Sequence, residues 1–224
     1  MNRETAEEIL RRLSVEYPGS IKGKRYRGSP FQALIVTILS AQTTDRSVDL
    51  VRGHLFKRYP SPEALSGADI GEVEEIIHST GFFHVKARHI IAAAGTLVSD
   101  FGGRVPESMD ELVRIPGVGR KTANIVLYHV FGRNEGVAVD THVARLSGRI
   151  GFTDHREQDR IERDLMALFP GSSWGPLTDL LISHGRAVCT ARSPKCPACV
   201  IRDTCRYYRE TFLPGLSPPD KGGT

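Results

Sequence analysis

One stretch near the middle of the chain, residues 112–124, limits what the sequence can fold into. It reads LVRIPGVGRKTAN, so an apolar helical turn runs into Pro116 and a new helical pattern starts directly after Gly119. We expect Gly117 and Gly119 to adopt backbone angles that other residues avoid, and to let a ligand approach the main chain. The free N–H groups and positive dipole end of the second helix favour phosphate there. The stretch therefore predicts a helical hairpin that contacts phosphate through its backbone, without sequence preference.

Lys121 falls in the first turn of the second helix, where the helix dipole repels a cation. That repulsion, together with the partial burial that we expect at this position, favours the neutral amine. A neutral amine is a nucleophile that can form a Schiff base at a carbonyl-level carbon. A lysine that only contacts a phosphate explains the position equally well, so both roles stay open on these residues.

A second polar residue stands at a predicted helix start. The short apolar run at 136–139 ends at Asp140, and a helical pattern with Val143, Leu146 and Ile150 follows. Asp commonly caps a helix in this position, which is a structural role. A carboxylate held there can also act as a general base or stabilise a developing positive charge. The two roles are compatible.

Composition narrows the class of protein. The 224 residues carry a formal net charge of +4 and are 40% hydrophobic, which allows a packed core and suits a polyanionic partner without establishing one. The N-terminus has no apolar signal core, and no apolar run reaches the roughly 18 residues of a membrane span. We therefore expect a cytoplasmic protein without membrane contact, in which thiols stay reduced.

All four cysteines lie in one short segment, with the spacing Cys-x6-Cys-x2-Cys-x5-Cys. Four soft ligands so close together predict a metal site rather than disulfides. A four-cysteine zinc site normally has two Cys-x2–4-Cys pairs, whereas this segment has one. The expected ligands are Cys189, Cys196, Cys199 and Cys205.

The rest of the chain reads as helix. Short helical patterns follow one another between residues 22 and 132, and strand patterns are almost absent. Closely linked short helices of this kind indicate an all-α bundle.

Three motifs together resemble the helix-hairpin-helix DNA glycosylases, in particular their endonuclease III branch. The hairpin IPGVGRKTAN at 115–124 is similar to the hairpin of that branch, and VDTHV at 139–143 resembles its catalytic aspartate segment. The cysteine spacing resembles that of its [4Fe–4S] loop. The superfamily motif has Gly-Pro before the aspartate, where this chain has Ala138-Val139, a form that fits the endonuclease III branch. The resemblance covers about residues 3–209.

The resemblance implies an all-α, two-lobed fold, with a six-helix bundle lobe that carries the hairpin and a second lobe that carries an iron–sulfur cluster. The expected bundle lobe spans residues 22–132, and residues 1–21 and 133–209 form the other lobe. Residues 210–224 are rich in Pro and Gly, and we expect them to form a flexible tail.

The resemblance also implies a base excision repair enzyme. Such an enzyme removes oxidised or damaged pyrimidines from duplex DNA and cleaves the abasic strand by β-elimination. Lys121 would attack the sugar C1′ of a flipped nucleotide and form a Schiff base, while Asp140 would stabilise the oxocarbenium-like charge. The base must leave the stack because its reacting bond is hidden there. We expect a monomer that binds double-stranded DNA with a damaged pyrimidine or an abasic site, associated with the nucleoid if the source is prokaryotic.

Residues outside the catalytic pair also have expected DNA contacts. Gln42 matches a family glutamine that fills the gap left by the extruded base, and an amide can donate to and accept from an orphaned base at once. Phe82 and Phe83 are either core anchors or an apolar wedge that unstacks bases. Charges in the longest cysteine gap either contact phosphates or balance an anionic cluster. The expected DNA-binding residues are Gln42, Gly117, Val118, Gly119, Arg120, Arg192 and Lys195.

Two other functions compete with this one. The first is a monofunctional relative that removes a mispaired base without cutting the strand, and such relatives lack a lysine at the position of Lys121. The second is a non-catalytic DNA-binding or redox-sensing module. The combination of Lys121 with Asp140 argues against that module.

Overall fold

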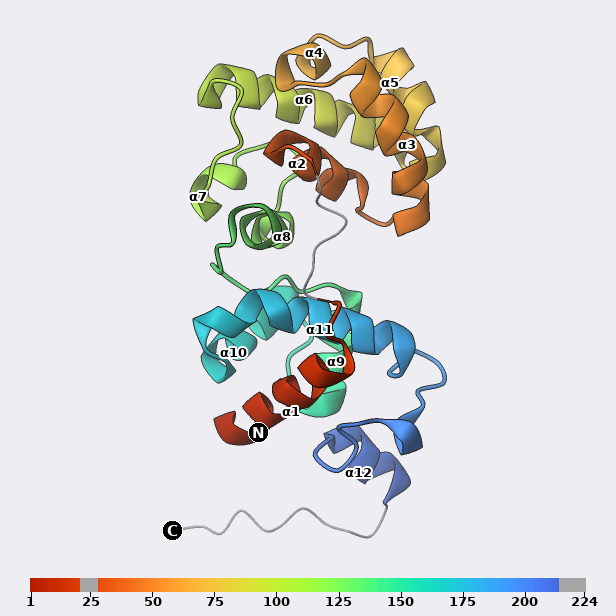
Figure 1. Cartoon of the computed structure of the whole chain (residues 1–224), viewed down its shortest axis with the longest axis vertical. Helices are drawn as coiled ribbons and strands as arrows, with labels where there is room; N and C mark the ends of the chain where they lie inside the picture. The colour runs from red at the N-terminus through yellow and green to blue at the C-terminus, as the bar shows by residue number, and fades with distance from the viewer. Residues whose placement is uncertain (21–27, 214–224) are drawn as a thin grey trace. The chain divides into compact units, whose positions relative to one another are not determined.

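The computed structural model describes residues 1–20 and 28–213, and the regular elements in these residues are all helices (Figure 1). The all-α expectation is therefore confirmed. The chain divides into two compact units, Gly23–Glu135 and Met1–Lys22 with Gly136–Thr224. The boundary expected at residue 22 lies outside the described residues, and the second division falls after Glu135, where the sequence suggested residue 132.

The first unit is a bundle of short helices. Its described residues, from 28 to 135, form six helices of five residues or more, the one-turn helix α7 and a short 3-10 turn, η2. These elements are α2 (Pro30–Leu39), α3 (Asp45–Arg58), α4 (Pro62–Ser66), α5 (Ile70–Ile77), η2 (His78–Thr80), α6 (Phe83–Phe101), α7 (Met109–Leu112) and α8 (Arg120–Phe131).

Helix α2 lies at the centre of this unit and packs against α3, α6 and α8. It begins at Pro30, because proline lacks the N–H that a first helical residue leaves unpaired, and Ser29 caps it by accepting a hydrogen bond from the backbone N–H of Gln32. Every residue from Ala33 to Leu39 is buried. A helix that is apolar on all sides needs other helices around it, so α2 organises the bundle.

The second unit joins the two ends of the chain. Helix α11 packs against both α1 and α9, so the N-terminal helix shares a core with the C-terminal part. Ile9 and Leu13 of α1 are fully buried in that core with Leu146 and Leu177. The elements are α1 (Arg3–Glu16), α9 (Thr141–Ile150), α10 (Gln158–Leu168), η3 (Gly171–Ser173), α11 (Trp174–Ala187), η4 (Cys196–Ala198) and α12 (Arg206–Phe212).

The first residues of the expected tail are helical. Helix α12 runs to Phe212, past residue 209, because Tyr207 and Tyr208 pack against the core of the second unit and extend the ordered helix. The remaining residues of the expected tail, 214–224, lie outside the described part of the chain.

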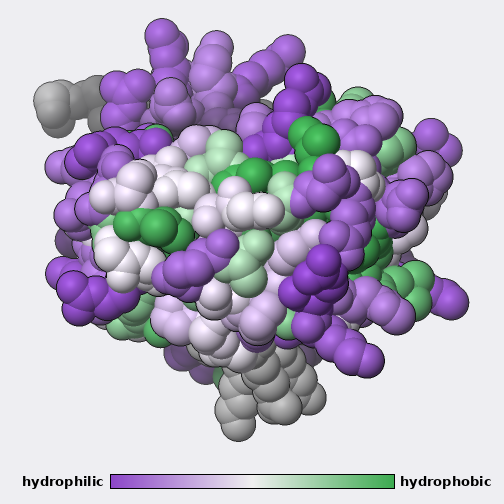
Figure 2. Space-filling view, turned by 90° about the horizontal axis from the view of Figure 1, so that it is seen from above, coloured by the Kyte–Doolittle hydropathy of each residue, from purple (hydrophilic) through white to green (hydrophobic). Residues whose placement is uncertain are grey.

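In the face seen in Figure 2, hydrophilic residues dominate and hydrophobic ones form small separate patches. Among the described residues, no helix combines the length and the apolar character needed to cross a membrane.

Candidate functional site

Apolar side chains anchor the hairpin between α7 and α8 on the core of the first unit. Ile115 and Val118 are both buried in the core of the first unit. Gly117, between them, has φ +79°, a left-handed conformation that favours glycine. A Cβ at Gly117 would also lie 3.1 Å from the Cβ of His89 in α6. This glycine is therefore required both by its backbone angle and by the close approach of α6.

Gly119 does not follow the expectation from sequence. Its φ is −95° and its ψ is 176°, which is extended backbone that any residue can adopt. A Cβ built there meets no atom within 4 Å, so the protein itself places no demand for glycine at this position. Gly119 is the N-cap of α8 and supplies no side-chain cap, so the first turn of α8 presents its N–H groups beside open space.

The side chains that follow the hairpin are exposed. Lys121 lies in the first turn of α8 as expected, but its side chain is exposed rather than partly buried, because the buried face of α8 starts only at Ala123 and Asn124. Arg120 is also exposed. The buried side chain of Val118 leaves only its backbone for a ligand.

A pocket of about 320 Å³ lies beside the hairpin, within the same unit. It brings Gln42, which follows α2, next to Gly117 of the hairpin, although these residues are far apart in sequence. The other lining residues are Ile38, Ala41, Phe82, Val85, Lys86 and His89. Most of them come from the loop before α6 and from its first two turns.

The two aromatics of this loop have different positions. Phe83 packs against the core of the first unit, whereas the side chain of Phe82 is 68% exposed at the pocket. The anchoring role therefore belongs to Phe83, and Phe82 is free to contact a ligand.

The pocket also contains two titratable residues that the sequence motifs do not indicate, Lys86 and His89. Lys86 continues the buried stripe formed by Ile90, Ala94 and Leu97 on α6. A lysine at a core position of an amphipathic helix is unusual, because lysine is almost never buried without a specific partner. This position is the sequence signal that would have identified Lys86.

Asp140, in the second unit, is held as the sequence predicts. It is the N-cap of α9, and its Oδ1 accepts a hydrogen bond of 2.8 Å from the backbone N–H of Val143. The preceding residues 137–139 are buried, whereas Asp140 is half-buried. The capping role is thus confirmed. The second carboxylate oxygen, Oδ2, takes no part in the bond to Val143.

The four cysteines lie between α11 and α12. Cys196 and Cys205 are buried, Cys189 and Cys199 are half-buried, and none of the four is in a disulfide. Burial, together with the nearby sulfurs of the other three, raises the pKa of Cys199 to about 11. Thiolates held this close therefore need positive charge, which iron supplies. The described residues contain no group of three or more His, Cys, Asp or Glu side chains placed to hold a single metal ion.

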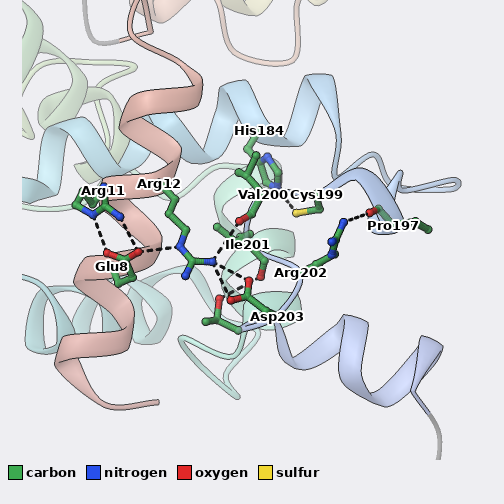
Figure 3. A network of polar contacts seen from close by, with 11 residues as sticks. Glu8, Arg11, Arg12, His184, Pro197, Cys199, Val200, Ile201, Arg202 and Asp203 are labelled. Carbon is green, nitrogen blue, oxygen red and sulfur yellow. Dashed lines mark hydrogen bonds and ion pairs between the residues drawn. The ribbon is translucent and has the colours of Figure 1, made fainter.

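Hydrogen-bond donors reach the sulfurs from two helices. The guanidinium of Arg149, in α9, lies 3.4 Å from the Sγ of Cys189. The Nε2 of His184, in α11, lies 3.4 Å from the Sγ of Cys199 (Figure 3). The Nδ1 of His184 in turn lies 3.0 Å from the hydroxyl of Tyr17. Burial lowers the pKa of His184 to about 4, so this imidazole is neutral at neutral pH. The donor set fits an iron–sulfur cluster, whose sulfurs accept such bonds.

Helix α1 also contacts the cysteine segment, residues 189–205. Arg12 of α1 donates to the carboxylate of Asp203 at 2.7 Å and to the carbonyl oxygen of Val200 at 3.4 Å, and Glu8 holds the same guanidinium at 2.8 Å (Figure 3). Asp203 is the only acidic residue of the cysteine segment, and its carboxylate is paired with Arg12. Arg192 and Lys195, in contrast, are exposed, and neither side chain has an ion-pair partner among the described residues.

The chain is similar to known repair enzymes over most of its length. Residues 35–171 match the HhH-GPD superfamily of base excision DNA repair proteins, and residues 189–205 match the iron–sulfur binding domain of endonuclease III. Endonuclease III of Synechocystis sp. is 50% identical over 203 residues, which cover 91% of this chain and 92% of that protein. The chain belongs to the endonuclease III family.

Further relatives agree with this membership. Endonuclease III of Escherichia coli is 37% identical over 95% of this chain and 100% of its own length. A solved structure of a trapped covalent intermediate of endonuclease III with DNA has 35% identity and a TM-score of 0.87, and covers 95% of this chain and 99% of that one. As a member of the endonuclease III family, the chain is a DNA glycosylase and abasic-site lyase of base excision repair, with a [4Fe–4S] cluster as its cofactor.

The two hairpin glycines allow a prediction that separates folding from ligand approach. We expect Gly117→Ala to lower the free energy of unfolding by about 1–2 kcal/mol, because alanine must adopt a left-handed backbone and its methyl group crowds His89. Gly119→Ala should change stability by less than about 1 kcal/mol, since its backbone is extended and its surroundings are open. Urea unfolding measures both effects.

The substitution at Gly119 should instead affect the affinity for DNA. A methyl group at Gly119 projects beside the first N–H groups of α8, so Gly119→Ala should weaken binding to duplex DNA at least about fivefold, by obstructing phosphate approach. Equal DNA affinity of Gly119→Ala and the unaltered protein would contradict a phosphate contact at this turn.

Proposed function

We propose that this enzyme excises damaged pyrimidines from double-stranded DNA and then nicks the strand by β-elimination, acting as a monomer on cytoplasmic DNA. The observation that carries the proposal is Lys121, an exposed lysine in the first turn of α8, directly after the glycine hairpin. A lysine there gives the enzyme its own nucleophile. A monofunctional glycosylase needs only an activated water, so the lysine favours the bifunctional reaction.

Lys121 supplies the nucleophile in this proposal. The lone pair of its Nζ attacks C1′ of the damaged nucleotide, and the glycosidic C–N bond breaks as the base leaves with the bonding electrons and takes up a proton. Ring opening gives a Schiff base between Nζ and C1′. Loss of a C2′ proton then expels the 3′ phosphate, and water releases the lysine.

Asp140 assists the departure of the base. Its carboxylate is fixed by the cap hydrogen bond to Val143, so it needs no reorganisation when positive charge develops on the sugar. The same carboxylate can accept and return protons during formation of the Schiff base.

The first unit supplies the remaining DNA contacts that we propose. Backbone groups of Gly117, Val118 and Gly119, with the side chain of Arg120, bind the phosphates next to the flipped nucleotide. Gln42 fills the gap that the base leaves, with its amide toward the orphaned partner base. A damaged base costs less to unstack than an intact one, which adds to selectivity.

In the second unit, we propose that Cys189, Cys196, Cys199 and Cys205 are the four cluster ligands. The cluster holds the segment between them in place when bound. The charges of that segment, Arg192 and Lys195, then contact the DNA backbone.

The role of Lys121 is tested by Lys121→Gln. We expect this variant to fold and to bind DNA with an abasic-site analogue, since the backbone donors of the hairpin remain. It should form no borohydride-trapped adduct with abasic DNA, and its turnover should fall by orders of magnitude, because loss of a covalent route costs several kcal/mol. A normal yield of trapped adduct from Lys121→Gln would exclude this lysine as the nucleophile.

The role of Asp140 is tested by Asp140→Asn. Asparagine caps a helix about as well as aspartate, so we expect the free energy of unfolding to change by less than about 1 kcal/mol. Release of the damaged base should nevertheless slow sharply in single-turnover assays, because the amide lacks the negative charge. Gross unfolding of this variant would instead show that the carboxylate is mainly structural.

The phosphate contacts of the cysteine segment are tested by Arg192→Ala and Lys195→Ala. Each should weaken DNA binding on every sequence and reduce the slope of log affinity against log salt by about one unit. Arg11→Ala, which removes a cation that is already paired with Glu8 on α1, is the matched control. If the slope stays unchanged in both variants, Arg192 and Lys195 do not contact phosphates, and their charges face the cluster or solvent instead.

A further inference from the structure

Two residues beside the pocket have an unusual backbone. Gln42 and Phe82 have φ values of 51° and 50°, and they are the only residues other than glycine with positive φ in the described part of the chain. Both line the 320 Å³ pocket. Left-handed backbone costs a residue with a side chain about 1–2 kcal/mol, and glycine would avoid this cost. The chain thus keeps a glutamine and a phenylalanine where glycine would fold more easily.

A buried lysine links the two turns that contain these residues. The Nζ of Lys86, in α6, donates to the Oγ1 of Thr43, directly after Gln42, and to the carbonyl oxygen of Thr80, two residues before Phe82, at 2.9 Å. The Oγ1 of Thr43 also donates to the carbonyl oxygen of Thr80. We call this set of Lys86, Thr43 and Thr80 the lysine clamp.

Each atom of the lysine clamp has a compatible role. The ammonium has three donors and uses two of them, and the carbonyl oxygen of Thr80 accepts with both lone pairs. The hydroxyl of Thr43 accepts from Lys86, and its single proton faces the carbonyl oxygen of Thr80 and, at 3.2 Å, that of Ala41. The contacts join positions 37 and 43 residues apart in sequence, so they fix the two turns relative to each other.

The lysine is costly for the fold. Lys86 is only 5% exposed, and its burial lowers the pKa of the ammonium. An apolar side chain on this stripe of α6 would pack without that cost, because a buried charge has to be compensated by its hydrogen bonds. General stability therefore does not account for Lys86, whereas precise placement of the two turns does.

We propose that Lys86 is a positioning residue that holds Gln42 and Phe82 in their left-handed turns, and that it thereby sets how strongly the enzyme distinguishes the base opposite the lesion. This inference rests on the proposed contact of Gln42 with the orphaned base. An amide can read the edge of a base only if its backbone is fixed, and the lysine clamp fixes the residue directly after Gln42.

The test compares Lys86→Met, Gln42→Ala and the double variant. Methionine keeps most of the length and apolar volume of the lysine stem and removes its donors. The probe is a duplex with a single tetrahydrofuran abasic-site analogue opposite A, C, G or T, and the readout is the spread of the four dissociation constants. The matched control is Thr37→Val, which removes a buried hydroxyl that donates to Ala33 within α2 of the same unit, outside the pocket.

We expect Gln42→Ala and Lys86→Met each to reduce the spread by about fivefold or more, since one bidentate contact to a base discriminates by roughly this amount or more. The double variant should equal either single variant, because both changes remove the same contact. Thr37→Val should keep the full spread, because its hydroxyl bonds within α2 and lies outside the pocket. If Lys86→Met fails to fold, Thr43→Val, which removes the central hydroxyl and keeps the side-chain shape, should reduce the spread in its place.

Several results would overturn the inference. If Gln42→Ala reduces the spread and neither Lys86→Met nor Thr43→Val does, the lysine clamp does not position Gln42, and the proposed role of Gln42 stands. If Gln42→Ala leaves the spread intact, both the contact and the inference fail, whereas borohydride trapping through Lys121 is unaffected. Additive effects in the double variant, or an equal loss of spread in Thr37→Val, would show that Lys86 acts through general stability.

Discussion

The burial of Ile115 and Val118 on both sides of Gly117 is the constraint on which the hairpin of the first unit depends. These two side chains fix the turn on the core, so the backbone between them must adopt a left-handed angle and pass close to His89 of α6. The start of α8 is thereby placed beside open space, with Gly119, Arg120 and Lys121 exposed. Apolar packing on one side of the hairpin thus makes donors and an amine available on the other.

The cysteine segment is built in a different way. It contributes one fully buried aliphatic side chain, Ile201, and its own helical content is limited to η4. Polar side chains from three helices reach it instead: Arg12 from α1, Arg149 from α9 and His184 from α11. A segment with so little apolar core depends on its metal for stability, as small metal-bound domains do. Apolar packing of Ile9 and Leu13 with α11 places the N-terminal helix in the same unit, and from there Arg12 reaches the cysteine segment.

Much of the fold and part of the site could be predicted from local sequence. The helical class follows from short apolar periodicities, and the Asp140 cap follows from a residue type that bonds to the backbone three residues further on. The exposure of Lys121 could not be predicted, because it depends on which face of α8 packs against α2. The sequence likewise offered no reason to separate Phe82 from Phe83, since adjacent loop residues differ in burial only once the loop is packed.

The sequence by itself determined the chemical inventory: four cysteines at fixed spacing, a glycine hairpin followed by a lysine, and an aspartate at a helix start. These features act over a few residues, so they are encoded where they occur. Tertiary structure decided which of the two glycines is conformationally required, and it placed Gln42 beside Gly117. It also buried Lys86 between Thr43 and Thr80. Contacts between residues distant in sequence form only when helices pack, because packing alone sets which side chains meet.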